Sequence, residues 1–186
     1  MKHIFCTFLL VFILVSCENS NQIKEIEMLT YFTDARDFEI YSITDKNGFT
    51  QTLFKSQTSK KYVDNYQSRI GKSLIDSIIS ICKNADNESF KFIAQKKMWY
   101  CGNWHSVQVT YENGEKIIFK YPYANNKNKQ FIPFQSLNKQ IQKDSLLATR
   151  LDIGQLGWLY IKQEDLSNYT FKKDSIEMKK YIEEHK

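Results

Sequence analysis

The chain has 186 residues, with 26 Lys and Arg against 21 Asp and Glu and a formal net charge of +5 at pH 7. These charges are spread along the sequence without a basic stripe, so nucleic acid is not an expected partner. Aromatic residues make up 15% of the chain, whereas there are only 6 Gly and 2 Pro, a balance that argues against disorder and favours a packed, strand-rich domain.

The first element along the chain is an apolar run from Ile4 to Val15, which follows the positively charged Lys2. A run of this length is too short to span a bilayer as a helix, which needs about 20 residues, and it predicts a secretory signal peptide. The run ends in Leu14-Val15-Ser16-Cys17. This ending resembles the lipobox of small bacterial lipoproteins, a class with many members of unknown function that includes inhibitor and immunity types.

The resemblance implies that residues 1–16 are removed as a lipoprotein signal peptide and that Cys17 carries palmitate-type acyl chains. Each buried acyl CH₂ contributes about 0.8 kcal/mol, so several chains anchor a protein firmly to a membrane. Glu18, rather than Asp, follows the cysteine, and the expected location is therefore the cell envelope, at the outer membrane. The alternatives are an ordinary cleaved signal and an uncleaved anchor with a chance cysteine. Residues 17–28 are expected to form a polar tether, and residues 29–186 a single domain.

Two stretches of this domain predict β-hairpins. One covers residues 38–54 around Asn47-Gly48, and the other covers residues 106–121 around Asn113-Gly114. An Asn-Gly pair between β-rich runs is a strong hairpin signal.

The second hairpin also predicts its own register. A three-residue loop over 112–114 places Val109 opposite Ile117 and Val107 opposite Phe119, which gathers the apolar side chains on one face. A slip of one residue would exchange the two faces, so burial selects this register. Gly114 then supplies the left-handed residue of the turn.

Each hairpin is followed by a stretch with helical periodicity, one starting at Ser73 and the other near Pro133. The sequence therefore predicts an α+β fold, in which two ββα-like units form an antiparallel sheet with the helices packed on one face. Further strands are predicted at residues 90–94 and 156–161, and residues 173–186 predict a charged terminal helix.

Cys82 and Cys101 are the two cysteines of the expected domain. Outside the cytoplasm, two thiols favour a disulfide, which would stabilise the fold by roughly 3 kcal/mol. The alternative is that Cys82, on an apolar helix face, is a buried free thiol.

The stretch from Met98 to His105 is unusually aromatic, and it includes Trp99, Tyr100 and Trp104. Pairing Cys101 with His105 as nucleophile and base would give a catalytic site, but no third residue can be named to orient the base. The simplest interpretation is an aromatic strand end packed under a loop. A further possibility is that Trp99, Tyr100, Trp104 and His105 form a contact patch, because Trp and Tyr are enriched in binding hot spots.

No metal or cofactor is expected, because the histidines and cysteines lack zinc-type spacing and no glycine-rich phosphate loop occurs. Three functional hypotheses follow. The first is a lipid-anchored envelope protein that binds a protein or small ligand without catalysis. The alternative is an envelope hydrolase with dispersed catalytic residues, and the third is a purely structural envelope component.

Overall fold

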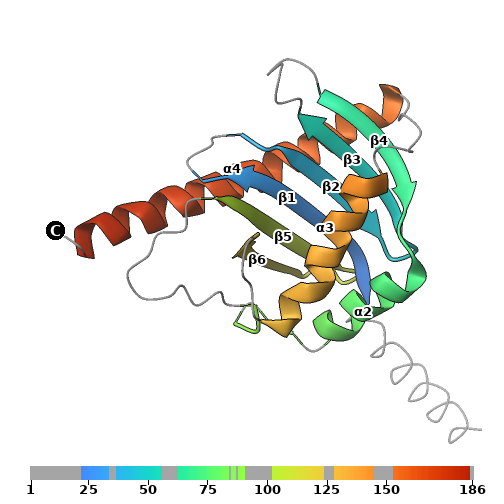
Figure 1. Ribbon diagram of the computed structural model, residues 1–186, viewed down its shortest axis with the longest axis horizontal. Coiled ribbons are helices and arrows are strands. Elements are labelled where there is room, and N and C mark those ends of the chain that lie inside the picture. Colours follow the sequence, from blue (N-terminus) through green and yellow to red (C-terminus); the bar gives the residue numbers. More distant parts are fainter. Residues whose placement is uncertain are drawn as a thin grey trace, which may run out of the picture.

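The computed structural model describes residues 22–33, 37–55, 63–83, 85–86, 88–90, 102–123, 128–144 and 153–184. Within this part of the chain, a six-stranded antiparallel sheet has helices on both faces (Figure 1), which confirms the predicted α+β class. The strands are β1 (Ile23–Phe32), β2 (Ile40–Asp45), β3 (Phe49–Lys55), β4 (Val63–Arg69), β5 (Asn103–Tyr111) and β6 (Lys116–Pro122). The helices are α2 (Lys72–Cys82), α3 (Ile132–Asp144) and α4 (Ile153–Glu184), with a short 3-10 helix η1 (Lys129–Phe131) before α3.

The sheet has the strand order β4-β3-β2-β1-β5-β6, so β1 lies inside it, paired with β2 and β5. The prediction that a polar tether extends to residue 28 is therefore wrong for residues 23–28. These residues form a strand because both of its faces are buried. Ile26 and Met28 enter the core on one face, and Glu27 finds polar partners on the other.

The β5–β6 hairpin has the predicted register, with Val109 opposite Ile117 and Val107 opposite Phe119. Gly114 has φ +86° in the turn, as expected for a glycine in the left-handed region. Gly48, in the turn between β2 and β3, has φ +82° and lies against the chain that enters α2. A Cβ at Gly48 would lie 2.4 Å from the carbonyl oxygen of Ile70, so this turn has no room for a side chain.

Helices α2 and α3 pack on the same face of the sheet, as predicted, and α2 begins one residue before its expected start (Figure 1). Strand β4, which the two-unit pattern did not include, lies between the first hairpin and α2. The core on this face combines apolar side chains of both helices and of the sheet: Ile75, Ile78, Cys82, Phe134, Leu137, Ile141, Ile26, Met28, Val107, Val109 and Phe119.

Helix α4 crosses the opposite face of the sheet, so the expectation of helices on one face only is incomplete (Figure 1). The predicted strand at residues 156–161 is wrong, because these residues form the beginning of α4, and the predicted terminal helix is the end of the same element. Leu159 and Leu166 are spaced seven residues apart on one side of α4 and are buried against the sheet. The helix forms because this sheet face also needs an apolar cover.

Of the predicted strand at residues 90–94, Phe90 belongs to a turn and is buried, with its ring stacked on Phe119 at 4.1 Å between centroids. Residues 91–94 lie outside the described residues.

Candidate functional site

The structure separates the two described members of the predicted aromatic contact patch. Trp104 and His105 are neighbours on β5 and therefore point to opposite faces of the sheet. Trp104 lies on the α4 side, where its indole N–H donates to Thr33 Oγ1 at 3.1 Å and Lys120 Nζ lies 5.2 Å from its ring. His105 lies on the α2–α3 side and is fully buried. They do not form one surface, and Trp99 and Tyr100 lie outside the described residues.

His105 belongs to a buried polar cluster. Its Nδ1 lies 2.9 Å from Thr30 Oγ1, and Thr30 also donates to Asn138 Oδ1 at 3.4 Å. The imidazole packs against the Tyr121 ring, with 5.0 Å between centroids. Burial lowers the pKa of His105 to about 4, so the ring is neutral at physiological pH. This environment suits a structural histidine better than a general base facing a substrate.

Cys82 is a free thiol in this structure, buried on the core side of α2. Burial raises the pKa of Cys82 to about 12, so the thiol is not an activated nucleophile. Cys101, which is the predicted disulfide partner of Cys82 and the candidate nucleophile beside His105, lies outside the described residues. The same is true of Cys17, the predicted lipidation site. The Cys82–Cys101 pairing and the lipidation of Cys17 therefore stay predictions.

A buried carboxylate lies at the centre of the α4-facing side of the sheet. Glu27 accepts hydrogen bonds from Tyr41 Oη at 2.6 Å and from Gln108 Nε2 at 2.5 Å. Lys162 of α4 reaches Glu25 at 2.5 Å and Glu27 at 3.4 Å. Desolvation lowers the pKa of Lys162, but the hydrogen bond to Glu25 and the two carboxylate charges outweigh it, and the pKa is raised overall. Since a buried charge is costly unless paired, this network fixes α4 on the sheet.

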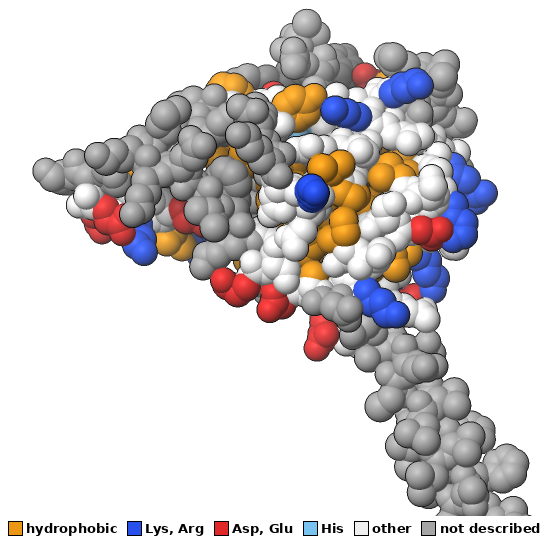
Figure 2. All heavy atoms as spheres, turned by 60° about the horizontal axis from the view of Figure 1, so that its bottom comes forward, with side chains coloured by type: hydrophobic (Ala, Val, Ile, Leu, Met, Phe, Trp, Pro, Cys, Tyr) orange, Lys and Arg blue, Asp and Glu red, His pale blue; other side chains and the backbone are white. Residues whose placement is uncertain are grey.

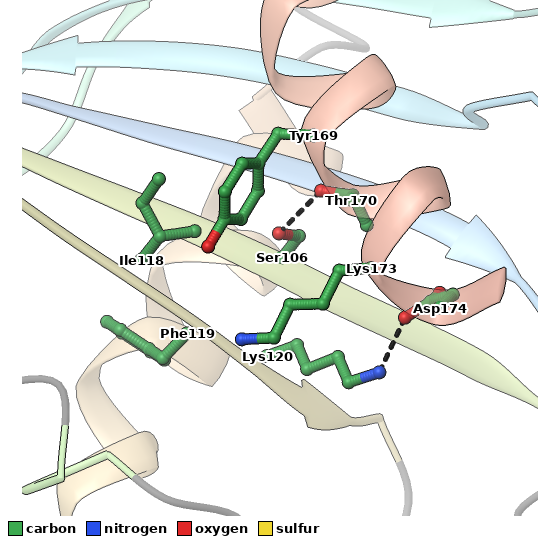
Figure 3. Close-up of a pocket in the computed structure, with 8 residues that line it drawn as sticks. All are labelled: Ser106, Ile118, Phe119, Lys120, Tyr169, Thr170, Lys173 and Asp174. Carbon is green, nitrogen blue, oxygen red and sulfur yellow. Dashed lines mark hydrogen bonds and ion pairs between the residues drawn. The ribbon is translucent and has the colours of Figure 1, made fainter. Parts of the chain in front are cut away.

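A second polar network joins α4 to β1 and β6 beside a small cavity (Figure 3). Asp174 accepts hydrogen bonds from Tyr31 Oη at 2.8 Å and from Lys120 Nζ at 2.5 Å, and Lys120 also reaches Glu177 at 2.5 Å. Burial, followed by the charge of Asp174, raises the pKa of Tyr31 well above its usual range.

The cavity lies between β5, β6 and α4, and its lining includes Ser106, Ile118, Tyr169 and Lys173 (Figure 3). At the edge of the cavity, Ser106 accepts a hydrogen bond from Thr170 at 2.9 Å. The cavity has a volume of about 10 Å³, which is room for about one water molecule. A cavity of this size does not admit a substrate, and two of its charged groups, Lys120 and Asp174, are already paired with each other.

Apolar exposure is concentrated on α4. Among the described residues, ten large apolar side chains are exposed, and six of them belong to this helix: Trp158, Tyr160, Ile161, Tyr169, Ile176 and Ile182. Ile161 and Ile176 are the two most exposed of the ten, at 62% and 59%. The buried side of α4 already covers the sheet, so these side chains do not contribute to the core. Three of the six, Trp158, Ile161 and Ile176, fall within a sector of about 60° that is turned away from the sheet. They make this outward face of α4 the candidate functional surface.

Another group of apolar side chains lies on the face that carries α2 and the start of α3 (Figure 2). Leu74, Ile79, Ile81 and Ala85 are partly buried there and pack against the core, while Ile132 is exposed. Since most of this group is engaged in packing, it is a weaker candidate for binding than α4.

Within the described ranges, no group of three or more His, Cys, Asp or Glu side chains is arranged to hold a metal ion. The same part of the chain contains no helix with the length and apolar character needed to cross a membrane.

The fold and the surface together define an α+β protein with a helix–sheet–helix arrangement and an apolar helix face turned outward. No family model matches the chain. A stretch of 48 residues is 40% identical to a UPF0597 protein of Elusimicrobium minutum (strain Pei191), which corresponds to 26% of this chain. The chain spans about a tenth of the length of this curated relative, since the match covers 11% of it.

Sequence reasoning missed both polar networks beneath α4. Glu25 and Glu27 alternate with Ile26 and Met28 along β1, a period of two that could have indicated a strand. Their partner Lys162 lies 137 and 135 residues further along the chain, and no local pattern connects it to them.

Proposed function

We propose that the protein is a lipid-anchored component of the bacterial cell envelope, attached to the outer membrane through Cys17, that acts by non-catalytic binding of a protein partner. The observation that carries this proposal is the outward face of α4, where large apolar side chains alternate with charged ones. Aromatic anchors such as Trp158 are typical of protein interfaces, and the most exposed apolar side chains, Ile161 and Ile176, lie on the same face of α4.

The described interior favours a protein partner over a small ligand or a substrate. The cavity beside α4 has room for one water molecule, whereas ligand pockets occupy about 300–1,000 Å³. The buried Glu27 and the partly buried Lys120 and Lys162 are committed to ion pairs and hydrogen bonds that hold α4 on the sheet. Binding across the outside of the helix needs none of these groups.

The membrane attachment is tested by expressing the full chain in a bacterial host and fractionating the cells. We expect wild-type protein in the outer-membrane fraction, with a mass for its N-terminal peptide that corresponds to acylated Cys17. The Cys17→Ala variant should lose both the lipid and the membrane fractionation. A wild-type chain that is unmodified and remains in the soluble fraction would contradict the anchor.

The binding role is tested by placing a photo-crosslinking amino acid at position 176 on α4, and at Lys139 on α3 as a control. Both positions are exposed, but they lie on opposite sides of the sheet. We expect specific protein adducts from position 176 that are absent from position 139. The proposal fails if the two positions give the same adducts, or if neither gives any.

A further inference from the structure

The outward face of α4 carries a continuous line of exposed residues at helical spacing. With about 3.6 residues per turn, the residues Trp158, Ile161, Asp165, Lys172, Ile176 and Lys179 fall within a sector of about 60° turned away from the sheet. The line is about 30 Å long, since the helix rises about 1.5 Å per residue.

This line is complementary to itself when it is read in the opposite direction. If two copies are laid antiparallel with the midpoint between residues 168 and 169, Ile161 of one copy faces Ile176 of the other. In the same alignment Asp165 faces Lys172, and the Trp158 ring faces Lys179. Asn168, which is exposed, lies next to its own copy at the midpoint. Each pairing occurs twice, as a two-fold symmetric interface requires.

We propose that the partner of the α4 outward face is a second copy of this chain, and that the two α4 helices pack antiparallel about a two-fold axis between residues 168 and 169. This inference deepens the proposed function, because it names the occupant of the same surface. It is independent of lipid attachment, so it can be tested whether or not Cys17 is acylated.

Charge complementarity favours a second copy over other occupants. Asp165 and Lys172 are exposed and have no ion-pair partner among the described residues. The dimer pairs both of them, in two symmetric copies. A bilayer would instead bury Asp165 and Lys172 without any compensating charge.

The exposure pattern agrees with this register. Ile161 and Ile176 are the most exposed large apolar side chains of the described chain, and the antiparallel alignment brings these two residues together. Isoleucine is not favoured at exposed helix positions by intrinsic propensity, since its branched side chain loses rotamer freedom there. Burial against a partner gives these positions a physical reason.

The interface is small. Stable dimers bury about 1,200 Å² or more, and one pair of helices in contact over about 30 Å lies at the lower end of that range. We therefore expect a dimer that dissociates in dilute solution. Confinement of two chains to the same membrane would raise their effective concentration and favour the dimer.

Cysteine crosslinking tests the register. In the full chain purified in detergent, Asn168→Cys should form a disulfide-linked dimer on mild oxidation, because the exposed position 168 meets its own copy near the axis. Ile161→Cys alone should not crosslink, since its copy lies about 22 Å away along the partner helix. A mixture of Ile161→Cys and Ile176→Cys chains should crosslink. The wild-type chain, treated in parallel, reports any dimer formed by the native cysteines.

Charge reversal tests the pairing of Asp165 with Lys172 by sedimentation equilibrium of the full chain. Asp165→Lys places two lysines opposite each other twice, and it should weaken self-association by at least about tenfold. The double variant Asp165→Lys with Lys172→Asp should restore it. Glu164→Lys is the matched control, because it makes the same change of charge at an exposed neighbour that points about 100° away, and it should have little effect.

Several outcomes would overturn the inference. The chain could remain monomeric up to several hundred micromolar with no crosslink at position 168. Alternatively, Ile161→Cys alone could crosslink, which would indicate a parallel or different register. Capture of another protein by α4 without self-association would also overturn it, while leaving the proposed binding function intact.

Discussion

Acidification should destabilise the protein through one residue, His105. The unfolded chain binds a proton at this histidine below its ordinary pKa of 6.5, whereas the folded chain binds one only near pH 4. Between these values the unfolded state holds more protons, so stability is complete above about pH 6.5 and falls as the pH approaches 4. The difference between the two pKa values corresponds to about 3 kcal/mol, most of which is lost between pH 7.5 and 4.5.

The groups around the imidazole do not offset this loss. Thr30, Asn138, Tyr121 and Tyr123 contact His105 or its neighbours from β1, α3 and the end of β6, and none of them ionises below pH 7. Among the described residues, no carboxylate is hydrogen-bonded to the imidazole, so none is placed to stabilise its protonated form. The proton would therefore enter an apolar, uncompensated site.

The assay is urea unfolding followed by tryptophan fluorescence at pH values from 7.5 to 4.5, for the wild type and for His105→Gln. Glutamine keeps a hydrogen-bonding group opposite Thr30 but does not titrate. All other acidic groups contribute equally to both proteins, so the difference between the two curves isolates His105. Equal pH dependence of the wild type and the variant would refute the reasoning.

Three further predictions concern single buried or strained positions. Glu27→Ala should lower the free energy of unfolding, measured by urea titration, by about 3 kcal/mol, because the Tyr41 hydroxyl and the Gln108 amide lose their hydrogen-bond acceptor. A loss below about 1 kcal/mol would contradict the network. Gly48→Ala should lower the thermal unfolding temperature clearly more than Gly114→Ala. Both glycines have positive φ, but only a Cβ at Gly48 would meet backbone atoms, so equal decreases would contradict that close contact. Cys82 should resist alkylation in the native protein, because it is buried. After denaturation without a reductant, a free Cys82 thiol reacts with the alkylating agent, whereas a requirement for reductant would indicate a disulfide.

The features that the sequence predicted correctly are those whose cause is local. The β5–β6 register follows from an Asn-Gly turn and from alternating side chains within 16 residues, 106–121, so it needs no knowledge of the rest of the fold. Helices α2 and α3 were predicted because their apolar stripes lie on one side, at helical spacing. In both cases a single buried face decides the structure.

Strand β1 was missed because one of its two buried faces carries charged side chains, Glu25 and Glu27. Lys24, Glu25 and Glu27 suggest a solvated tether when the sequence is read locally. The strand is stable because Glu27 accepts hydrogen bonds from Tyr41 of β2, Gln108 of β5 and Lys162 of α4. A buried carboxylate is tolerable only when such partners exist, and they come from three distant parts of the chain.

The error at residues 156–161 has a different origin, and it bears on function. Leu156, Trp158, Leu159, Tyr160 and Ile161 look like a strand by composition because apolar and aromatic residues succeed one another without a polar face. A two-sided strand inside a sheet would bury all of them. As a helix, the segment buries Leu159 and leaves Trp158 and Ile161 exposed, so the same excess of apolar residues that suggested a strand becomes an uncovered outward face. An ordinary surface helix covering a sheet needs only one apolar stripe, and the proposed contact with a partner would give the second stripe on α4 a physical reason.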